Sequence, residues 1–401
     1  SSGSTLLKFG CIPSVAPAIM KFGFVLPFAV SVDALILQQQ QGSAAPSIPS
    51  FDAFLQTKEH TYLADSAEYH QRRAYYEKRE SEAAEQNSRR QRRWTAGVNE
   101  LWDWSDEEFA TLRGYRGRGA SATAAGARSG HVALLQNATF TNATEVFPAE
   151  KHWKNLAATT QIRRQGGCGS CWAIAAVTVL QAHAELHAGL KRTFSAQQLV
   201  SCVPNPKQCG GAGGCKGATV ELAMDWVMTN GIAEEHEVPY AAQDLACSAP
   251  KSTTILMHSG VNQRTNFGMT GWEKLPENKY APLMRALVEQ GPVAVSGSAN
   301  GWAVYSKGIF DGCPLDAVVD HAITAVGFGV EGNDKYWTIQ NSWGQHWGEQ
   351  GYMRILRHDD DSDRCGINHQ PELGTACIGG PTQVPVCGMC GILYDSVVPH
   401  F

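Results

Sequence analysis

The stretch Gln165-Gly-Gly-Cys168-Gly-Ser170-Cys171-Trp172 decides the fold class, because the apolar run behind it predicts a buried helix that begins at Cys171. This run continues to Gly189, a residue type that often ends a helix. A cysteine in the first helical turn feels the positive end of the helix dipole, which lowers the pKa of its thiol. A nearby imidazole would complete a thiolate–imidazolium pair. Gln165 could offer a side-chain N–H to an oxyanion, beside the Cys171 backbone N–H.

Two later segments have the composition of strands. His321 begins the apolar run 321–329, and Asn341 follows the segment 335–340. If these strands are antiparallel neighbours, His321 and Asn341 meet, and the Asn341 amide oxygen accepts a hydrogen bond that orients the imidazole. Trp343 would then cover this hydrogen bond and keep water away from it. The sequence therefore predicts a Cys–His–Asn site.

The segments Cys168–Trp172 and Asn341–Tyr352 resemble those of papain-like cysteine peptidases of the cathepsin L type. His321 lies 150 residues after Cys171 and Asn341 lies 170 after it, and the resemblance covers roughly residues 50–370. It implies an α+β fold with two lobes, preceded by a mainly helical propeptide. The expected helical lobe contains the Cys171 helix and a second helix near 219–230. The other lobe is expected to be an antiparallel β-barrel, with strands near 293–296, 321–328, 336–340 and 352–356.

The resemblance also implies the chemistry. Cys171, His321, Asn341 and Gln165 are expected to be catalytic, with hydrolysis of peptide bonds through a Cys171 thioester and with no cofactor or metal. Substrate contacts are expected from the positions that match the family's binding residues, namely Gly217, Ala218, Val319, Asp320, Ser296, Trp343 and Gln370. Ala218 adds a methyl group where the family has a second glycine. We expect an endopeptidase, because no residues indicate an occluding loop.

Two alternatives share these features. A catalytically silent relative would bind peptides or a partner protein in the same place, although all three residues of the expected triad are present. A transpeptidase or ligase would use the same thioester and resolve it with an amine instead of water.

The region before the catalytic motif is rich in helix-forming residues. One stripe of a helix over 52–87 is formed by residues at intervals of three or four: Glu68, Arg72, Tyr76, Arg79, Ala83 and Asn87. This stripe resembles the inhibitory propeptide of cathepsin L-like zymogens, with Arg79 in place of Asn and Ala83 in place of Ile. Gly97-x-Asn99-x-Leu101-x-Asp103 resembles the second propeptide motif. We therefore expect an inhibitory propeptide over 50–112.

The following residues, 113–146, are expected to form a flexible linker that contains a cleavage site. Residues 113–130 are basic and rich in Gly, Ala and Ser. Asn137 and Asn142 each begin a glycosylation sequon. The mature peptidase domain, with a cysteine-containing tail, is expected to span 147–401.

The N-terminal segment 1–45 has the character of an upstream piece and a signal peptide. Met20-Lys21 precedes a short apolar run, 22–30, which is too short to cross a membrane. Met20 is the expected start, and a longer signal anchor is the alternative. This segment predicts entry into the secretory pathway, with a lysosome, a vacuole or the extracellular space as the destination.

The 12 cysteines agree with an oxidising compartment. The resemblance suggests three pairs, Cys168–Cys215, Cys202–Cys247 and Cys313–Cys365, with Cys171 free. Four cysteines beyond the family core stay unassigned: Cys209, Cys377, Cys387 and Cys390. We favour disulfides in the tail over a metal half-site at Cys387-Gly-Met-Cys390, because a second cysteine pair with zinc spacing is missing.

Charge further limits the partners. The net charge is −5, and the acidic excess lies after residue 147, which argues against nucleic acid as a partner. We expect a monomer whose partners are protein or peptide substrates and its own propeptide.

Overall fold

The region expected to be a propeptide contains three helices and one short strand. The computed structural model describes residues 48–58, 62–115, 146–247 and 267–401, all within one unit that spans Pro46–Phe401. The elements of this first region are α2 (Phe51–Leu55), α3 (Ala67–Ser88), β1 (Trp94–Ala96) and α4 (Asp106–Arg113). The prediction of one helix over 52–87 is therefore wrong at its start, because α2 ends at Leu55 and α3 begins only after its N-cap, Ser66. The predicted signal segment, both sequons and most of the linker lie outside the described residues.

The predicted stripe on α3 faces the rest of the propeptide. Tyr76 and Ala83 are buried, and the Arg79 side chain reaches α4, where it pairs with Asp106 at 2.8 Å. Asn87 holds β1 by accepting from the Ala96 N–H and donating to the Ala96 carbonyl, both at 3.0 Å. Of the two residues that depart from the family pattern, Ala83 is thus a fully buried small side chain, and Arg79 forms an ion pair with α4.

Helix α4 has a strong local start signal. The Ser105 side chain accepts from the Glu108 N–H, and the Glu108 carboxylate accepts from the Ser105 N–H, which is a capping box. Glu108 also binds Arg72 of α3, with two contacts at 2.5 and 2.8 Å. The helix ends at Gly114, whose φ of 75° a residue with a side chain adopts only with strain.

The helical region surrounds the Cys171 helix, as expected. Its elements are α5 (Ala157–Thr160), α6 (Cys171–Ala188), α7 (Ala196–Cys202), the 3-10 turn η1 (Gly214–Lys216) and α8 (Val220–Asn230). Helix α6 is buried over its first fourteen residues, which explains why its sequence is apolar on every side. Gly189 ends it in the left-handed conformation with φ 66°, and α8 confirms the second predicted helix.

The remaining elements form the sheet region, which also holds one helix. In chain order they are β2 (Lys151–His152), β3 (Gly271–Lys274), α9 (Tyr280–Glu289), β4 (Val293–Gly297), η2 (Trp302–Val304), β5 (Tyr305–Phe310), β6 (His321–Glu331), β7 (Asp334–Gln340), β8 (Tyr352–Arg357), β9 (Cys365–Asn368), η3 (Pro371–Leu373), β10 (Val384–Cys387), η4 (Met389–Gly391) and β11 (Ser396–His400). All four predicted strands are present, as β4, β6, β7 and β8.

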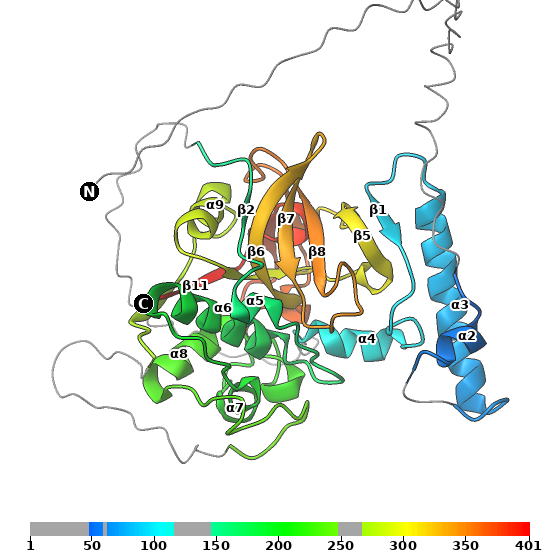
Figure 1. Cartoon of the computed structure of the whole chain (residues 1–401), viewed down its shortest axis with the longest axis horizontal. Coiled ribbons are helices and arrows are strands. Elements are labelled where there is room, and N and C mark those ends of the chain that lie inside the picture. The colour runs from blue at the N-terminus through cyan, green and yellow to red at the C-terminus, as the bar shows by residue number, and fades with distance from the viewer. Residues whose placement is uncertain (1–47, 59–61, 116–145, 248–266) are drawn as a thin grey trace, which may run out of the picture. The chain divides into compact units, whose positions relative to one another are not determined.

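The sheet has the order β1-β5-β8-β7-β6-β4-β11-β3, with β2 added beside β6 (Figure 1). Every pair in it is antiparallel except β5–β8. The prediction of a β-barrel is wrong. Among the described strands, no pairing joins β1 to β3, so the sheet stays open. Strands β6 and β7 are antiparallel neighbours, as the sequence predicted for the strands next to His321 and Asn341.

The propeptide joins this sheet as an edge strand. In Figure 1, β1 runs beside β5, and α3 lies on the side of β1 that faces away from β5. Gly308 of β5 makes the approach possible, since a methyl group there would lie 2.4 Å from the Arg93 carbonyl oxygen. Arg93 adds ion pairs with Asp311 at 2.9 Å and Asp334 at 3.1 Å. Strand pairing and charge therefore fix the expected propeptide on the sheet region.

The described residues contain five disulfides, and two of the three expected pairs are confirmed, Cys168–Cys215 and Cys202–Cys247. The predicted pair Cys313–Cys365 is wrong, because Cys313 pairs with Cys390 and Cys365 pairs with Cys387. The physical reason is that β9 and β10 are paired strands, which place Cys365 directly opposite Cys387. The fifth disulfide, Cys209–Cys377, joins the helical region to the segment between β9 and β10. Cys171 is free.

Candidate active site

Cys171 begins α6 and lies against the first residues of β6. Its Sγ accepts a hydrogen bond from the Ala322 N–H at 3.5 Å, and its thiol donates to the Arg113 carbonyl at 3.4 Å. The side chain is completely buried. The fold thus brings the residue after His321 into contact with a sulfur atom 151 residues earlier in the chain.

His321 and Asn341 form the expected pair. His321 Nε2 lies 2.8 Å from Asn341 Oδ1, and the same oxygen accepts from the Ser342 N–H at 2.8 Å. Because this atom already accepts from a backbone N–H, Nε2 must carry the proton of the neutral ring. The lone pair is then on Nδ1, which has no hydrogen-bond partner among the described residues. Trp343 packs on the imidazole with ring centroids 5.0 Å apart and is itself buried.

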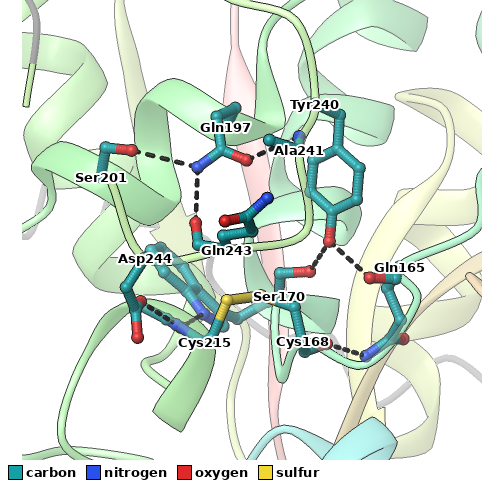
Figure 2. Close-up of a disulfide and its surroundings, with 12 residues drawn as sticks. Gln165, Cys168, Ser170, Gln197, Ser201, Cys215, Tyr240, Ala241, Gln243 and Asp244 are labelled. Carbon is teal, nitrogen blue, oxygen red and sulfur yellow. Dashed lines mark hydrogen bonds between the residues drawn. A yellow bond between two sulfur atoms is a disulfide. The ribbon is translucent and has the colours of Figure 1, made fainter. Parts of the chain in front are cut away.

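Gln165 is held in place from several sides. Ser342 Oγ donates to Gln165 Oε1 at 2.6 Å, so the amide N–H groups point the other way. The Tyr240 hydroxyl donates to the Gln165 carbonyl at 2.8 Å and accepts from the Ser170 hydroxyl (Figure 2). Figure 2 also shows the Cys168–Cys215 disulfide beside this network. The loop before α6 is therefore rigid where it carries both expected oxyanion donors.

The segment Leu112–Tyr115 of the propeptide covers this site. Gln165 Nε2 donates to the Leu112 carbonyl oxygen and to the Cys168 carbonyl oxygen, both at 2.9 Å. A methyl group on Gly114 would lie 2.3 Å from the Cys171 sulfur. Backbone of the propeptide thus takes up the side-chain N–H expected to bind an oxyanion, and it lies directly on the expected nucleophile.

Burial by the propeptide reverses the expected charge state. Desolvation raises the pKa of the Cys171 thiol to about 12, and the hydrogen bonds from Ala322 and Trp172 offset only part of this effect. Desolvation also lowers the pKa of His321 to about 4, although the bond to Asn341 acts in the opposite direction. Both shifts favour the neutral thiol and the neutral imidazole in this closed state, whereas the thiolate–imidazolium pair stays a prediction for the open enzyme.

The Tyr115 side chain fills a site lined by Gly210, Ala218 and Ser296, which we call the Tyr115 site. Its ring is only 2% exposed, and a methyl group on Gly210 would lie 2.7 Å from it. The Tyr115 hydroxyl lies 3.0 Å from Ser296 Oγ, and Ser296 donates to Asp395 at 2.6 Å. A chain of hydroxyl groups therefore leads from the propeptide side chain to a buried carboxylate.

The predicted substrate-binding residues divide into two groups. The first group lies around the propeptide segment: Gly217 is so close to Gly114 that a methyl group would meet its carbonyl oxygen at 1.8 Å, and Asp320 accepts from the Tyr115 N–H at 3.3 Å and pairs with Arg113 at 3.1 Å. Ser296 and Ala218 belong to this group as well, and Val319 is the chain neighbour of Asp320.

Gln370 stands apart from that group. It is exposed and precedes η3, and the polar group below Ser296 is Asp395 instead. Burial opposes ionisation of Asp395, but Lys274 at 3.2 Å and the Ser296 hydroxyl outweigh it and hold the pKa of Asp395 below its ordinary value.

Sequence reasoning missed the residues that occupy the site. It assigned Arg113 and the next residues to a flexible linker, whereas α4 extends through Arg113 and Tyr115 is buried. The signal was available, because the capping box of Ser105 and Glu108 is followed by Phe109 and Leu112 at helical spacing. Ser342, Tyr240 and Asp395 were missed because only the three-dimensional arrangement reveals what they contact.

Comparison with known proteins identifies the lineage. Residues 147–375 match the description "Papain family cysteine protease". The chain belongs to the papain family of cysteine proteases. It is 32% identical over 286 residues to the senescence-specific cysteine protease SAG12 of Arabidopsis thaliana, covering 69% of this chain and 75% of that one. It is 33% identical to the oryzain beta chain of Oryza sativa, where the match covers 68% of this chain and about half, 53%, of the rice protein.

Solved precursor structures have the same fold. A recombinant stem bromelain precursor is 26% identical, with a TM-score of 0.64, 88% of this chain covered and 97% of that chain. The digestive procathepsin L2 proteinase of Tenebrio molitor is 24% identical, with a TM-score of 0.65 over 87% of this chain and 98% of the other, which shows the fold alone. This papain-family chain is therefore a cysteine endopeptidase of the zymogen type.

No group of three or more His, Cys, Asp or Glu side chains among the described residues has the arrangement of a metal site. No described helix has both the length and the apolar character that a membrane crossing requires.

Proposed function

We propose that this chain cleaves internal peptide bonds by covalent catalysis at Cys171. After the propeptide leaves, the thiol proton passes to His321 Nδ1 and the sulfur attacks the substrate carbonyl carbon. The Gln165 side chain and the Cys171 backbone N–H stabilise the resulting oxyanion. The tetrahedral species collapses to a thioester when the C–N bond breaks, and His321 gives its proton to the departing amine.

The second half of the reaction uses the same groups. His321 takes a proton from water, and the hydroxide attacks the thioester carbon. The C–S bond then breaks, and the departing sulfur takes the proton from His321 to regenerate the thiol. Asn341 keeps the imidazole oriented during both halves, with Nε2 towards the amide and Nδ1 towards sulfur. The hydrogen bond from Gln165 to the Leu112 carbonyl carries this proposal, since it is made to a backbone carbonyl in the position a substrate would use.

We infer that residues 50–112, together with Arg113–Tyr115, act as an intramolecular inhibitor and that the mature enzyme begins near Phe147. Pairing of β1 with β5, two ion pairs of Arg93 and the buried Tyr115 support this role. Five disulfides support maturation in the secretory pathway, since such bonds persist in oxidising compartments. One relative is named a KDEL-tailed cysteine endopeptidase, which fits that pathway. We further propose a monomer that acts in a lysosome, a vacuole or the extracellular space.

Titration with a thiol-directed epoxide tests the proposed chemistry. The processed enzyme should incorporate one equivalent at Cys171 and lose peptide hydrolysis in proportion to labelling. Cys171→Ala should fold with an unchanged circular dichroism spectrum and show neither labelling nor hydrolysis. Hydrolysis that persists in this variant would contradict the assignment of the nucleophile.

A further inference from the structure

A segment of the tail crosses from the sheet region to the helical region. Residues Gln370–Gly380, which we call the strap, follow β9 and end before β10. The Cys209–Cys377 disulfide attaches the strap to the loop that precedes η1. Two backbone hydrogen bonds flank this disulfide, from the Gly210 N–H to the Ala376 carbonyl at 3.1 Å and from the Ile378 N–H to the Lys207 carbonyl at 2.9 Å. The attachment to the helical region is therefore both covalent and ordered.

The other end of the strap rests on Val319 of the sheet region. A methyl group on Gly374 would lie 2.1 Å from the Val319 carbonyl oxygen, so the two backbones are in direct contact. The turn η3 fixes this end, with the Gly374 N–H donating to the Pro371 carbonyl at 3.0 Å. Pro371 is buried, which makes this end a packed contact and not a loose connection.

The Tyr115 site lies between these two attachments. On the helical side, Gly210 contacts the Tyr115 ring and also receives the strap through its N–H group. On the sheet side, Val319 contacts the strap, and the next residue, Asp320, accepts from the Tyr115 N–H. The strap therefore connects the two walls that enclose the side chain, at positions adjacent to it on each side.

We propose that the strap is part of the substrate-binding site and that the Cys209–Cys377 bond sets how tightly the Tyr115 site holds a side chain. This inference rests on the proposed function and adds to it that a substrate side chain takes the place of Tyr115 in the processed enzyme. A covalent link between the walls reduces the number of conformations that binding must restrict, which strengthens binding without a new contact. No hydrogen bond or disulfide among the described residues joins the strap to Cys171 or His321, so its loss should raise KM and leave kcat nearly unchanged.

The first experiment compares processed enzymes. Cys209→Ser/Cys377→Ser removes the link, and the matched control Cys365→Ser/Cys387→Ser removes a disulfide within the paired strands β9 and β10. Paired peptides carry Tyr or Gly at the position that fills the Tyr115 site. For the Tyr peptide, the strap variant should raise KM about tenfold at similar kcat, while the Gly peptide and the control variant change little. An unchanged ratio of the two KM values in the strap variant would overturn the proposal.

The second experiment does not depend on catalysis. Hydrogen exchange of the Tyr115 amide is measured in the full chain carrying Cys171→Ala, which prevents self-cleavage. Exchange should accelerate about tenfold in the strap variant and not in the control. Gly374→Ala keeps the disulfide but pushes the strap off Val319, and it should give the same acceleration. It therefore provides the test if the double variant does not fold.

The outcomes separate the two proposals. If the Tyr115 amide exchanges at the same rate in the parent, the double variant and Gly374→Ala, the proposed role of the strap is refuted whatever the catalytic result. Absence of Cys171 labelling and hydrolysis in the processed parent would refute the proposed function, while accelerated exchange would still establish that the strap holds this site together.

Discussion

Replacing Tyr115 by alanine tests whether this single side chain keeps the zymogen closed. Tyr115 is buried with its ring against Gly210, and its hydroxyl contacts Ser296. Truncation of a buried aromatic side chain costs about 3–5 kcal/mol. We use the lower value. Water can enter the Tyr115 site when the propeptide opens, and this removes part of the free-energy cost of leaving a cavity there. A cost of about 3 kcal/mol corresponds to a rise of roughly 150-fold in the open fraction of the zymogen.

The open fraction can be measured through access to Cys171. Labelling of the intact zymogen by a thiol-directed epoxide at neutral pH requires that Leu112–Tyr115 leave the sulfur atom. When opening and closing are fast relative to labelling, the observed rate follows the open population. Tyr115→Ala should therefore label roughly 100-fold faster than the parent. Mass spectrometry of samples taken during labelling establishes that the chain is still full length.

Two further variants define the control. Tyr115→Phe removes only the hydroxyl group and should accelerate labelling about 2–12-fold, the equivalent of one hydrogen bond. Tyr75→Ala changes a tyrosine of α3 that contacts Gln71 on the surface and should have no effect. Labelling of Tyr115→Ala at the parental rate would refute the view that this side chain holds the propeptide in the cleft.

Three other variants probe the catalytic group, the propeptide and the pocket. Gln165→Ala should lower kcat of the processed enzyme about 10²–10³-fold with little change in KM, and an unchanged kcat would remove Gln165 from the oxyanion role. The hydrogen bond from Arg72 lowers the pKa of Glu108, so the ionised carboxylate stabilises the closed fold above pH 4.5 and this contribution is lost as pH falls through the lowered pKa. The Tm of the Cys171→Ala chain should thus fall less steeply between pH 6 and about 3.5 when Glu108→Gln is added, and parallel curves would contradict this ion pair's role. The parent should prefer peptides with Tyr over Phe in the Tyr115 site by about 2–12-fold in kcat/KM, the equivalent of one hydrogen bond. Ser296→Ala should abolish this preference.

The sequence predicted the elements whose local pattern is strong. Helix α6 has an unbroken apolar run and a glycine at its C-terminal end, and β6 and β7 have the composition of buried strands. Both features depend on neighbouring residues alone, so they can be read without coordinates. The antiparallel pairing of β6 and β7 followed from their closeness in the chain.

Contacts between distant segments could not be predicted in this way. Cys313 has several possible partners, and only the pairing of β9 with β10 shows that Cys365 is already opposite Cys387. The same limit applies to Asp395, whose position below Ser296 depends on β11 lying beside β4. Arg113 was assigned to a flexible linker on composition, although its carbonyl oxygen and side chain contact Cys171 and Asp320.

The closed state explains how one arrangement of residues can be both complete and inactive. His321 and Asn341 are already at hydrogen-bond distance, and Gln165 is already oriented, so opening does not need to rebuild these contacts. What the propeptide removes is water, and without water neither the thiol nor the imidazole gains by ionising. Departure of Leu112–Tyr115 lifts this desolvation from both groups at once, which lowers the pKa of the thiol and raises that of the imidazole. The closed state therefore covers the sulfur atom and also disfavours its ionised form.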